Sequence, residues 1–183
     1  MKKIFLLASL ATALFFTACN NGGGDTTAGA DSKKDSTGMT EEQKEERNKN
    51  AVMASINIFA SGGTDVDAIL KDVTSDAIEY GDGTMPSQKG RDSIANGMKM
   101  WLASFESKGK DLEAVADGNL VYVSGEWTVT WKTDFMGAKA NGKSTTYRDV
   151  DIFTFNDDGK ITSHRSTYPS GSVLSALGVP MPK

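Results

Sequence analysis

Asp151 and His164 are the two residues of this sequence whose chemistry suits proton transfer. Burial in apolar surroundings raises the pKa of a carboxyl group, and an imidazole titrates near neutral pH. A buried aspartate beside a histidine could therefore act as an acid and base pair on a bound molecule. His164 is the only histidine of the chain. These two residues are the candidate catalytic residues.

Both residues also have a structural interpretation. Asp151 could be a structural carboxylate that pairs with Arg148 or Arg165, and His164 could be a hydrogen-bonded residue of a cavity wall. A titratable side chain needs a plausible geometry before a catalytic role follows from it. The sequence alone leaves both interpretations open.

The candidate residues lie in segments that read as strands. Apolar and polar residues alternate from Val121 to Lys132, as in a half-buried strand. A second strand is predicted over 144–155, and the turn 156–159 leads into a third over 160–168. On the second strand, the period of two places the following residues on one face: Tyr147, Asp149, Asp151, Phe153 and Phe155.

Helices are predicted before these strands. Thr40 and Gln43 form a capping box that opens a helix with the apolar stripe Val52, Ile56, Phe59 and Ala60, which ends at Gly62–Gly63. Thr64 or Asp65 can cap a short second helix that carries Val66, Ile69, Leu70 and Val73. A brief strand follows over 77–80, and a third helix has the stripe Ile94, Met98, Trp101, Leu102 and Phe105. Helices first and antiparallel strands later predict an α+β domain whose helices cover one face of a curved antiparallel sheet.

The N-terminus predicts export and lipidation. Lys2 and Lys3 precede an apolar run that is too short to span a bilayer, as in a secretion signal over 1–18. Phe16-Thr17-Ala18-Cys19 resembles the lipobox of bacterial lipoproteins, with Phe in place of the usual Leu. Because Cys19 is the only cysteine, no disulfide competes for it. We expect lipid chains such as palmitate on Cys19 and a membrane-anchored protein of the bacterial cell envelope.

The composition after Cys19 separates a linker from a domain. Residues 19–39 are small or polar and predict a flexible linker, and the domain is expected over 40–183. Without Lys2 and Lys3 the chain has 18 basic and 24 acidic residues, so its formal net charge is −6. That balance and the lack of a basic patch argue against nucleic acid as a partner.

Three segments together carry a resemblance to a known superfamily. They are Gly90–Ile94 at the start of the third helix, Val150–Ile161 around the hairpin, and the closing segment Ser172–Val179. In this order they resemble the nuclear transport factor 2-like superfamily and its SnoaL-like branch of polyketide cyclases, over roughly 48–179. The resemblance implies a cone-shaped fold in which helices and a strongly bent sheet enclose a pocket.

The resemblance also implies site residues. By similarity to ketosteroid isomerases, the face of Asp151 looks into the pocket, and His164, Ser166 and Tyr168 point inward from the next strand. The isomerase pattern is incomplete, because its helix tyrosine and its base correspond to Ser55 and Gly81 here. For the cyclases the resemblance implies an acid or base at Asp151 or His164. The expected ligand-contacting residues are Trp127, Trp131, Tyr147, Phe153, Ser166 and Tyr168.

These features lead to one expected function and two alternatives. We expect the domain to bind a small apolar ligand or a partner segment in the envelope. The first alternative is a proton-transfer enzyme, such as a cyclase, isomerase or dehydratase, that uses Asp151 and His164. The second is a homodimer through the outer sheet face, with Tyr122, Thr128 and Thr130 in the interface. Nothing in the sequence requires a metal or an organic cofactor, since Asp157-Asp158-Gly159 lacks the other ligands of a calcium loop.

Overall fold

The computed structural model describes residues 38–180. The predicted signal peptide, Cys19 and the linker up to residue 37 lie outside this range. Within it, no helix is both long and apolar enough to cross a membrane. The elements in chain order are α1 (Glu41–Ala60), α2 (Val66–Ile69), β1 (Val73–Glu79), β2 (Gln88–Lys89), α3 (Arg91–Ser104), β3 (Phe105–Asp117), β4 (Leu120–Trp131), β5 (Ser144–Phe155), β6 (Ile161–Ser166) and α4 (Ser170–Leu177).

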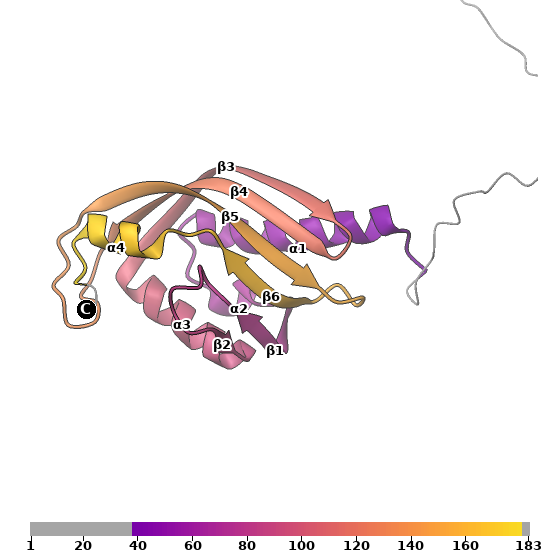
Figure 1. Ribbon diagram of the computed structural model, residues 1–183, viewed down its shortest axis with the longest axis horizontal. Helices are drawn as coiled ribbons and strands as arrows, with labels where there is room; N and C mark the ends of the chain where they lie inside the picture. The colour runs from indigo at the N-terminus through magenta and orange to yellow at the C-terminus, as the bar shows by residue number, and fades with distance from the viewer. Residues whose placement is uncertain (1–37, 181–183) are drawn as a thin grey trace, which may run out of the picture. The chain divides into compact units, whose positions relative to one another are not determined.

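A six-stranded sheet with the order β2-β1-β6-β5-β4-β3 forms one layer of the domain. All neighbouring strands are antiparallel except β1 and β6, which are parallel. The long strands β3, β4 and β5 arch over α1, α2 and α3, as Figure 1 shows. The predicted α+β class, with helices on one face of a curved sheet, is confirmed.

The predicted helix signals explain where α1 begins and ends. Thr40 accepts a hydrogen bond from the backbone of Gln43, and the Gln43 side chain accepts one from the backbone of Thr40, so the capping box is confirmed. Val52 and Ile56 of the predicted stripe are buried against the sheet. The helix ends before Gly63, where any Cβ atom would lie 2.7 Å from the Ile58 carbonyl oxygen.

The structure corrects two boundaries of the predicted elements. Val73, predicted in the second helix, begins β1, and Phe105, predicted in the third helix, begins β3. Strand β3 was also not predicted as a separate element. The alternation of apolar and polar residues in β3 is weak, because the next inward residue after Phe105 is the polar Ser107. Ser107 is buried and accepts a hydrogen bond from the Trp101 indole.

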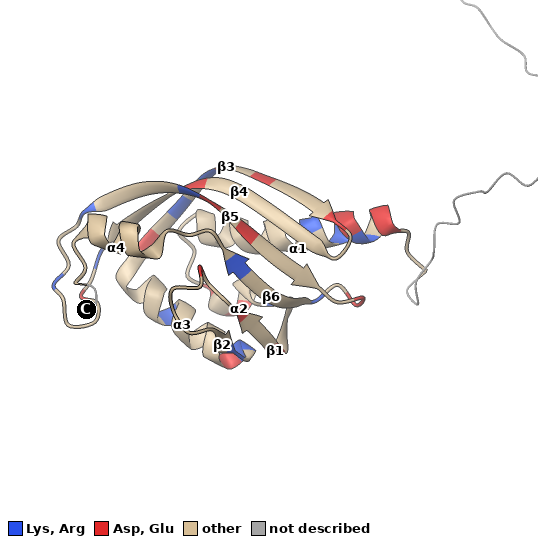
Figure 2. Ribbon diagram, viewed as in Figure 1, with Lys and Arg blue, Asp and Glu red and all other residues tan. Residues whose placement is uncertain are grey.

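The inner and outer faces of the sheet differ in character. The inward residues of β4, from Val121 to Trp131, are almost completely buried. The outward residues form hydrogen-bonded and charged pairs, such as Thr128 with Thr146 and Lys110 with Glu126 at 2.7 Å. In Figure 2, basic and acidic residues lie close together on the N-terminal half of α1 and are interspersed on the long strands. The alternative of a homodimer through the outer face stays a prediction.

Candidate functional site

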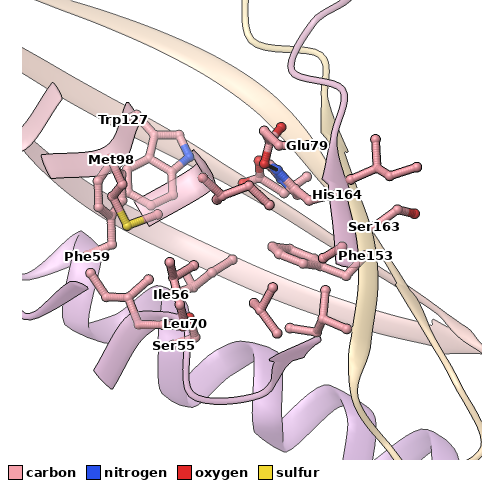
Figure 3. A pocket seen from close by; sticks show the side chains of 17 residues that line it. Ser55, Ile56, Phe59, Leu70, Glu79, Met98, Trp127, Phe153, Ser163 and His164 are labelled. Atoms are coloured by element: carbon pink, nitrogen blue, oxygen red, sulfur yellow. Dashed lines mark hydrogen bonds and ion pairs between the residues drawn. The ribbon is translucent and has the colours of Figure 1, made fainter. Parts of the chain in front are cut away.

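A cavity of about 210 Å³ lies between the helices and the inner face of the sheet. Its wall is mostly apolar, with side chains from all three of the helices that lie under the sheet, among them Ile56, Phe59, Ile69, Leu70, Ile94 and Met98. In Figure 3, Phe59, Met98 and Trp127 lie on one side of the cavity, and Glu79 and His164 lie on the other. The cavity thus has an apolar part and one ionisable end.

A histidine between two carboxylates forms the ionisable end. His164 Nε2 lies 3.0 Å from Asp151 Oδ1, and His164 Nδ1 lies 2.7 Å from Glu79 Oε2. All three side chains line the cavity, and each is less than a quarter exposed. We call Glu79, His164 and Asp151 the acid–imidazole cluster. The sequence brought Asp151 and His164 together as candidates, and the structure places them in direct contact.

Three neighbouring strands position the cluster. Glu79 of β1 and His164 of β6 are register partners in the parallel pair, so their side chains leave the sheet on the same side. Phe153 of β5 is the antiparallel partner of His164, and their rings lie 4.5 Å apart between centroids. Asp151 precedes Phe153 by two residues and lies on the same face of β5. The imidazole is therefore held by a ring contact and by a carboxylate at each nitrogen.

The electrostatics of the cluster favour a protonated imidazole. Burial by itself lowers the pKa of His164. The hydrogen bonds and negative charges of Asp151 and Glu79 outweigh burial and raise this pKa to about 10. Both ring nitrogens are already engaged with carboxylate oxygens, so a base role for His164 requires that one of these bonds first breaks.

Asp151 offers the free atom of the cluster. Glu79 accepts hydrogen bonds at both oxygens, from His164 and from the backbone N–H of Gly81 at 2.7 Å. Asp151 accepts one hydrogen bond, at Oδ1. Its Oδ2 has no hydrogen-bond partner in the described part of the chain, and this atom is not fully buried. A ligand in the cavity can therefore meet Oδ2.

A second aspartate lies next to the cluster. Asp149 precedes Asp151 on the same face of β5, is only 8% exposed, and its Oδ1 has no partner among the described residues. Burial, followed by the negative charge of Asp151, raises the pKa of Asp149 to about 7. The sequence placed Asp149 on the inward face, but nothing in it distinguished this residue from its neighbours.

The predicted ligand-contacting residues divide into two groups. Trp127 and Phe153 line the cavity. Tyr147 and Tyr168 instead pack on each other, with ring centroids 4.9 Å apart. Trp131 belongs to the apolar core around Phe105, and it is 1% exposed.

The remaining expected residue, Ser166, lies elsewhere. It borders a separate surface hollow with Asp82 and Arg165. Strand β6 ends at Ser166, and the residues of β6 that line the cavity are Ile161, Ser163 and His164. The cavity wall therefore does not extend to Ser166 and Tyr168.

Asp151 does not form the ion pair with Arg148 or Arg165 that the structural interpretation expected. Arg148 lies 3.8 Å from Glu126 on the outer face, and Arg165 lies over the Tyr80 ring at 5.1 Å from its centroid.

The two positions that correspond to the isomerase tyrosine and base form local hydrogen bonds. Ser55 donates a hydrogen bond to the Ile69 carbonyl, and Gly81 donates its backbone N–H to Glu79.

Sequence reasoning missed Glu79. It stands inside the short segment that was predicted as a strand, and its partner His164 is 85 residues away in the chain. The parallel pairing of β1 with β6 is the feature that brings them together, and no local pattern signals that pairing. Within residues 38–180, no group of three His, Cys, Asp or Glu side chains is arranged to hold a metal ion.

Comparison with known proteins places this chain in a family. A family model described as SnoaL-like polyketide cyclase matches residues 52–177. A search of curated proteins finds no match.

Solved structures share the fold at low identity. A candidate polyketide cyclase from Xanthomonas campestris pv. campestris is 22% identical with a TM-score of 0.66, over 73% of this chain and 98% of that one. An LEH-like epoxide hydrolase from M. tuberculosis is 16% identical with a TM-score of 0.57, over 73% and 91%. A protein with a ketosteroid isomerase-like fold from Catenulispora acidiphila, solved in complex with trimethylamine, is 19% identical with a TM-score of 0.55, over 69% and 93%.

Proposed function

The chain belongs to the SnoaL-like polyketide cyclase family, and on that premise we propose that its cavity binds a small, largely apolar molecule whose polar group meets Asp151. The observation that carries this proposal is the unpaired carboxylate oxygen Asp151 Oδ2, on a side chain at the ionisable end of a cavity whose wall is mostly apolar. Sites of this kind use apolar walls for affinity and a few polar groups for orientation. The relative solved with trimethylamine supports small-molecule binding in this fold.

The volume of the cavity limits the size of the ligand. An apolar cavity of about 150 Å³ is known to hold benzene. The cavity here is about 210 Å³, so it has room for a ring-sized apolar body and a few further atoms. A large polycyclic ligand requires the helices to move away from the sheet.

Native mass spectrometry of the protein purified from its own host tests the proposal. The chain from Asn20 onward keeps every described residue and omits the predicted lipidation site. We expect a co-purifying small mass in the parent, and loss of that mass in a Met98→Trp variant, which fills the apolar side of the cavity. The exposed Met100→Trp substitution on the same helix is the matched control, because Met100 is 57% exposed. A mass retained equally in both variants overturns the proposal.

A second candidate function is proton-transfer catalysis, favoured by the direct contact of His164 with Asp151 and Glu79 inside the cavity. A proton leaves a bound carbon acid for Asp151 Oδ2, the electron pair stays on the substrate, and the same proton returns to a different atom of the product. The protonated His164 holds Asp151 in place throughout. Proton transfer by a positioned side chain contributes about 10²–10⁴-fold to a rate.

The catalytic candidate has its own test. Once a bound compound is identified, its turnover or its exchange of hydrogen for deuterium in D₂O is measured. Asp151→Asn keeps the shape of the side chain but removes the proton acceptor, so we expect the rate of turnover or exchange to fall by at least about 10²-fold. Unchanged exchange in Asp151→Asn rules out this residue as the catalyst and leaves the domain as a binding module.

The N-terminal features support the further proposal that this domain works tethered to a membrane of the bacterial envelope. Residues 1–18 have the composition of a secretion signal, and Cys19 follows a lipobox-like segment. Metabolic labelling with palmitate tests it. We expect label on the parent chain and none on Cys19→Ser, and a labelled Cys19→Ser variant contradicts the proposal.

A further inference from the structure

The net charge of the acid–imidazole cluster follows from its two hydrogen bonds. Each bond contains one proton, whichever of its two atoms holds it. Two carboxylates and one imidazole ring that share two protons carry a net charge of −1. This charge is the same for a protonated His164 between two carboxylates and for a neutral His164 beside one protonated carboxyl.

With His164 protonated, the least compensated carboxylate of the cluster is Asp151. The two oxygens of Glu79 are compensated by His164 and by the backbone N–H of Gly81. Asp151 has a donor at Oδ1 only. Oδ2 is therefore the carboxylate oxygen of the cluster that has no donor among the described residues, and it belongs to a side chain that lines the cavity.

The cavity supplies no cation to balance this charge. Its described lining contains no Lys or Arg, and its only cationic group, His164, is already counted in the cluster. Arg148 and Arg165 belong to the outer face and to the separate surface hollow. An uncompensated charge in apolar surroundings is unfavourable, and a cation that binds there relieves this cost.

We propose that the cavity selects small monocations, namely compact apolar amines whose ammonium group donates a hydrogen bond to Asp151 Oδ2. The apolar body of the amine packs against Phe59, Leu70 and Met98, which line the rest of the cavity. This inference rests on the proposed binding function and names the charge of the ligand.

A pair of probes of nearly equal shape tests the charge. Benzylamine is a cation at pH 7, and benzyl alcohol is neutral. Calorimetric titration of the chain from Asn20 onward at one ionic strength is expected to show at least about tenfold tighter binding of benzylamine, as for a charge-assisted hydrogen bond. In Asp151→Asn the cluster loses its net charge, so this preference is expected to fall to about twofold or less.

Controls separate the possible outcomes. Asp92→Asn changes the same charge at an exposed position of α3 and is expected to keep the preference. If Asp151→Asn does not fold, Glu79→Gln removes one charge from the cluster while Asp151 remains, and it should also reduce the preference. Equal binding of the two probes by the parent overturns the amine inference and leaves the proposed binding function intact. Binding of neither probe at the cavity counts against both.

Discussion

Glu79 and His164 are linked through both backbone and side chain. They are register partners in the parallel pair of β1 and β6, and Glu79 Oε2 lies 2.7 Å from His164 Nδ1. The second carboxylate, Asp151, holds the other nitrogen of the ring at 3.0 Å. His164 is therefore a fixed bridge across three strands, and stability as well as function depends on it.

Removal of the imidazole is expected to destabilise the fold. In His164→Ala, Glu79 and Asp151 face each other without the cation between them, each with less than a quarter of its side chain exposed. Loss of one partner of a buried ion pair costs about 3–5 kcal/mol, and partial exposure reduces that to about 2–3 kcal/mol here. Urea unfolding at pH 7 measures the change. Lys139→Ala removes an ion pair on the surface and should have little effect, and an equally small effect of His164→Ala contradicts the bridge.

The stability of the protein should fall as pH rises above neutral. The folded pKa of His164, about 10, lies above its ordinary value of 6.5. The folded state therefore holds a proton that the unfolded chain releases, so the stabilisation is complete below pH 6.5 and is lost as pH rises toward 10. Urea unfolding in steps from pH 6 to pH 10 checks this. His164→Gln is expected to flatten the profile in this window, and a parent profile that is already flat rules the linkage out.

Asp149→Asn is expected to stabilise the protein at alkaline pH. The folded pKa of Asp149 is raised from 3.8 to about 7, chiefly by burial. The unfolded chain loses this proton first, so the carboxyl reduces stability progressively between pH 4 and pH 7 and by a constant amount above. At about 1.4 kcal/mol per unit of pKa, the amide should add about 2–4 kcal/mol at pH 8 and little at pH 4. Equal effects at both pH values contradict this assignment.

The two pH effects are distinguishable because their windows differ. Asp149 acts between about pH 4 and pH 7, and His164 acts between 6.5 and 10. The double variant Asp149→Asn with His164→Gln should show neither slope. If the stability of the double variant still changes with pH in one of these two ranges, another group titrates in that range.

The sequence was informative where a pattern is local. The capping box at Thr40 and the alternation from Val121 to Trp131 depend on neighbouring residues, and both are confirmed. The inward face of β5, with Asp151 and Phe153, follows from the period of two. The contact between Glu79 and His164 could not be predicted in this way, because it depends on which distant strands become neighbours. Trp131 shows a second limit. The alternation of the strand predicts that its side chain points inward, but not whether it lines a cavity or packs in the core, where the structure places it.

Gly109 links the packing of α1 to the shape of the cavity. A Cβ atom at this position of β3 would lie 2.9 Å from Ala60 Cβ and 2.9 Å from the Trp127 indole, and Trp127 lines the cavity. Gly109→Ala must therefore push the indole aside, at a cost of about 1–3 kcal/mol as in other overpacked cores. We expect both a lower free energy of unfolding in urea and weaker benzylamine binding. Gly171→Ala on α4 is the control, since a Cβ atom there meets nothing within 4 Å. A Gly109→Ala variant that is as stable as the parent, with unchanged binding, would show that the Trp127 indole is free to move and that its packing against Gly109 does not set the cavity wall.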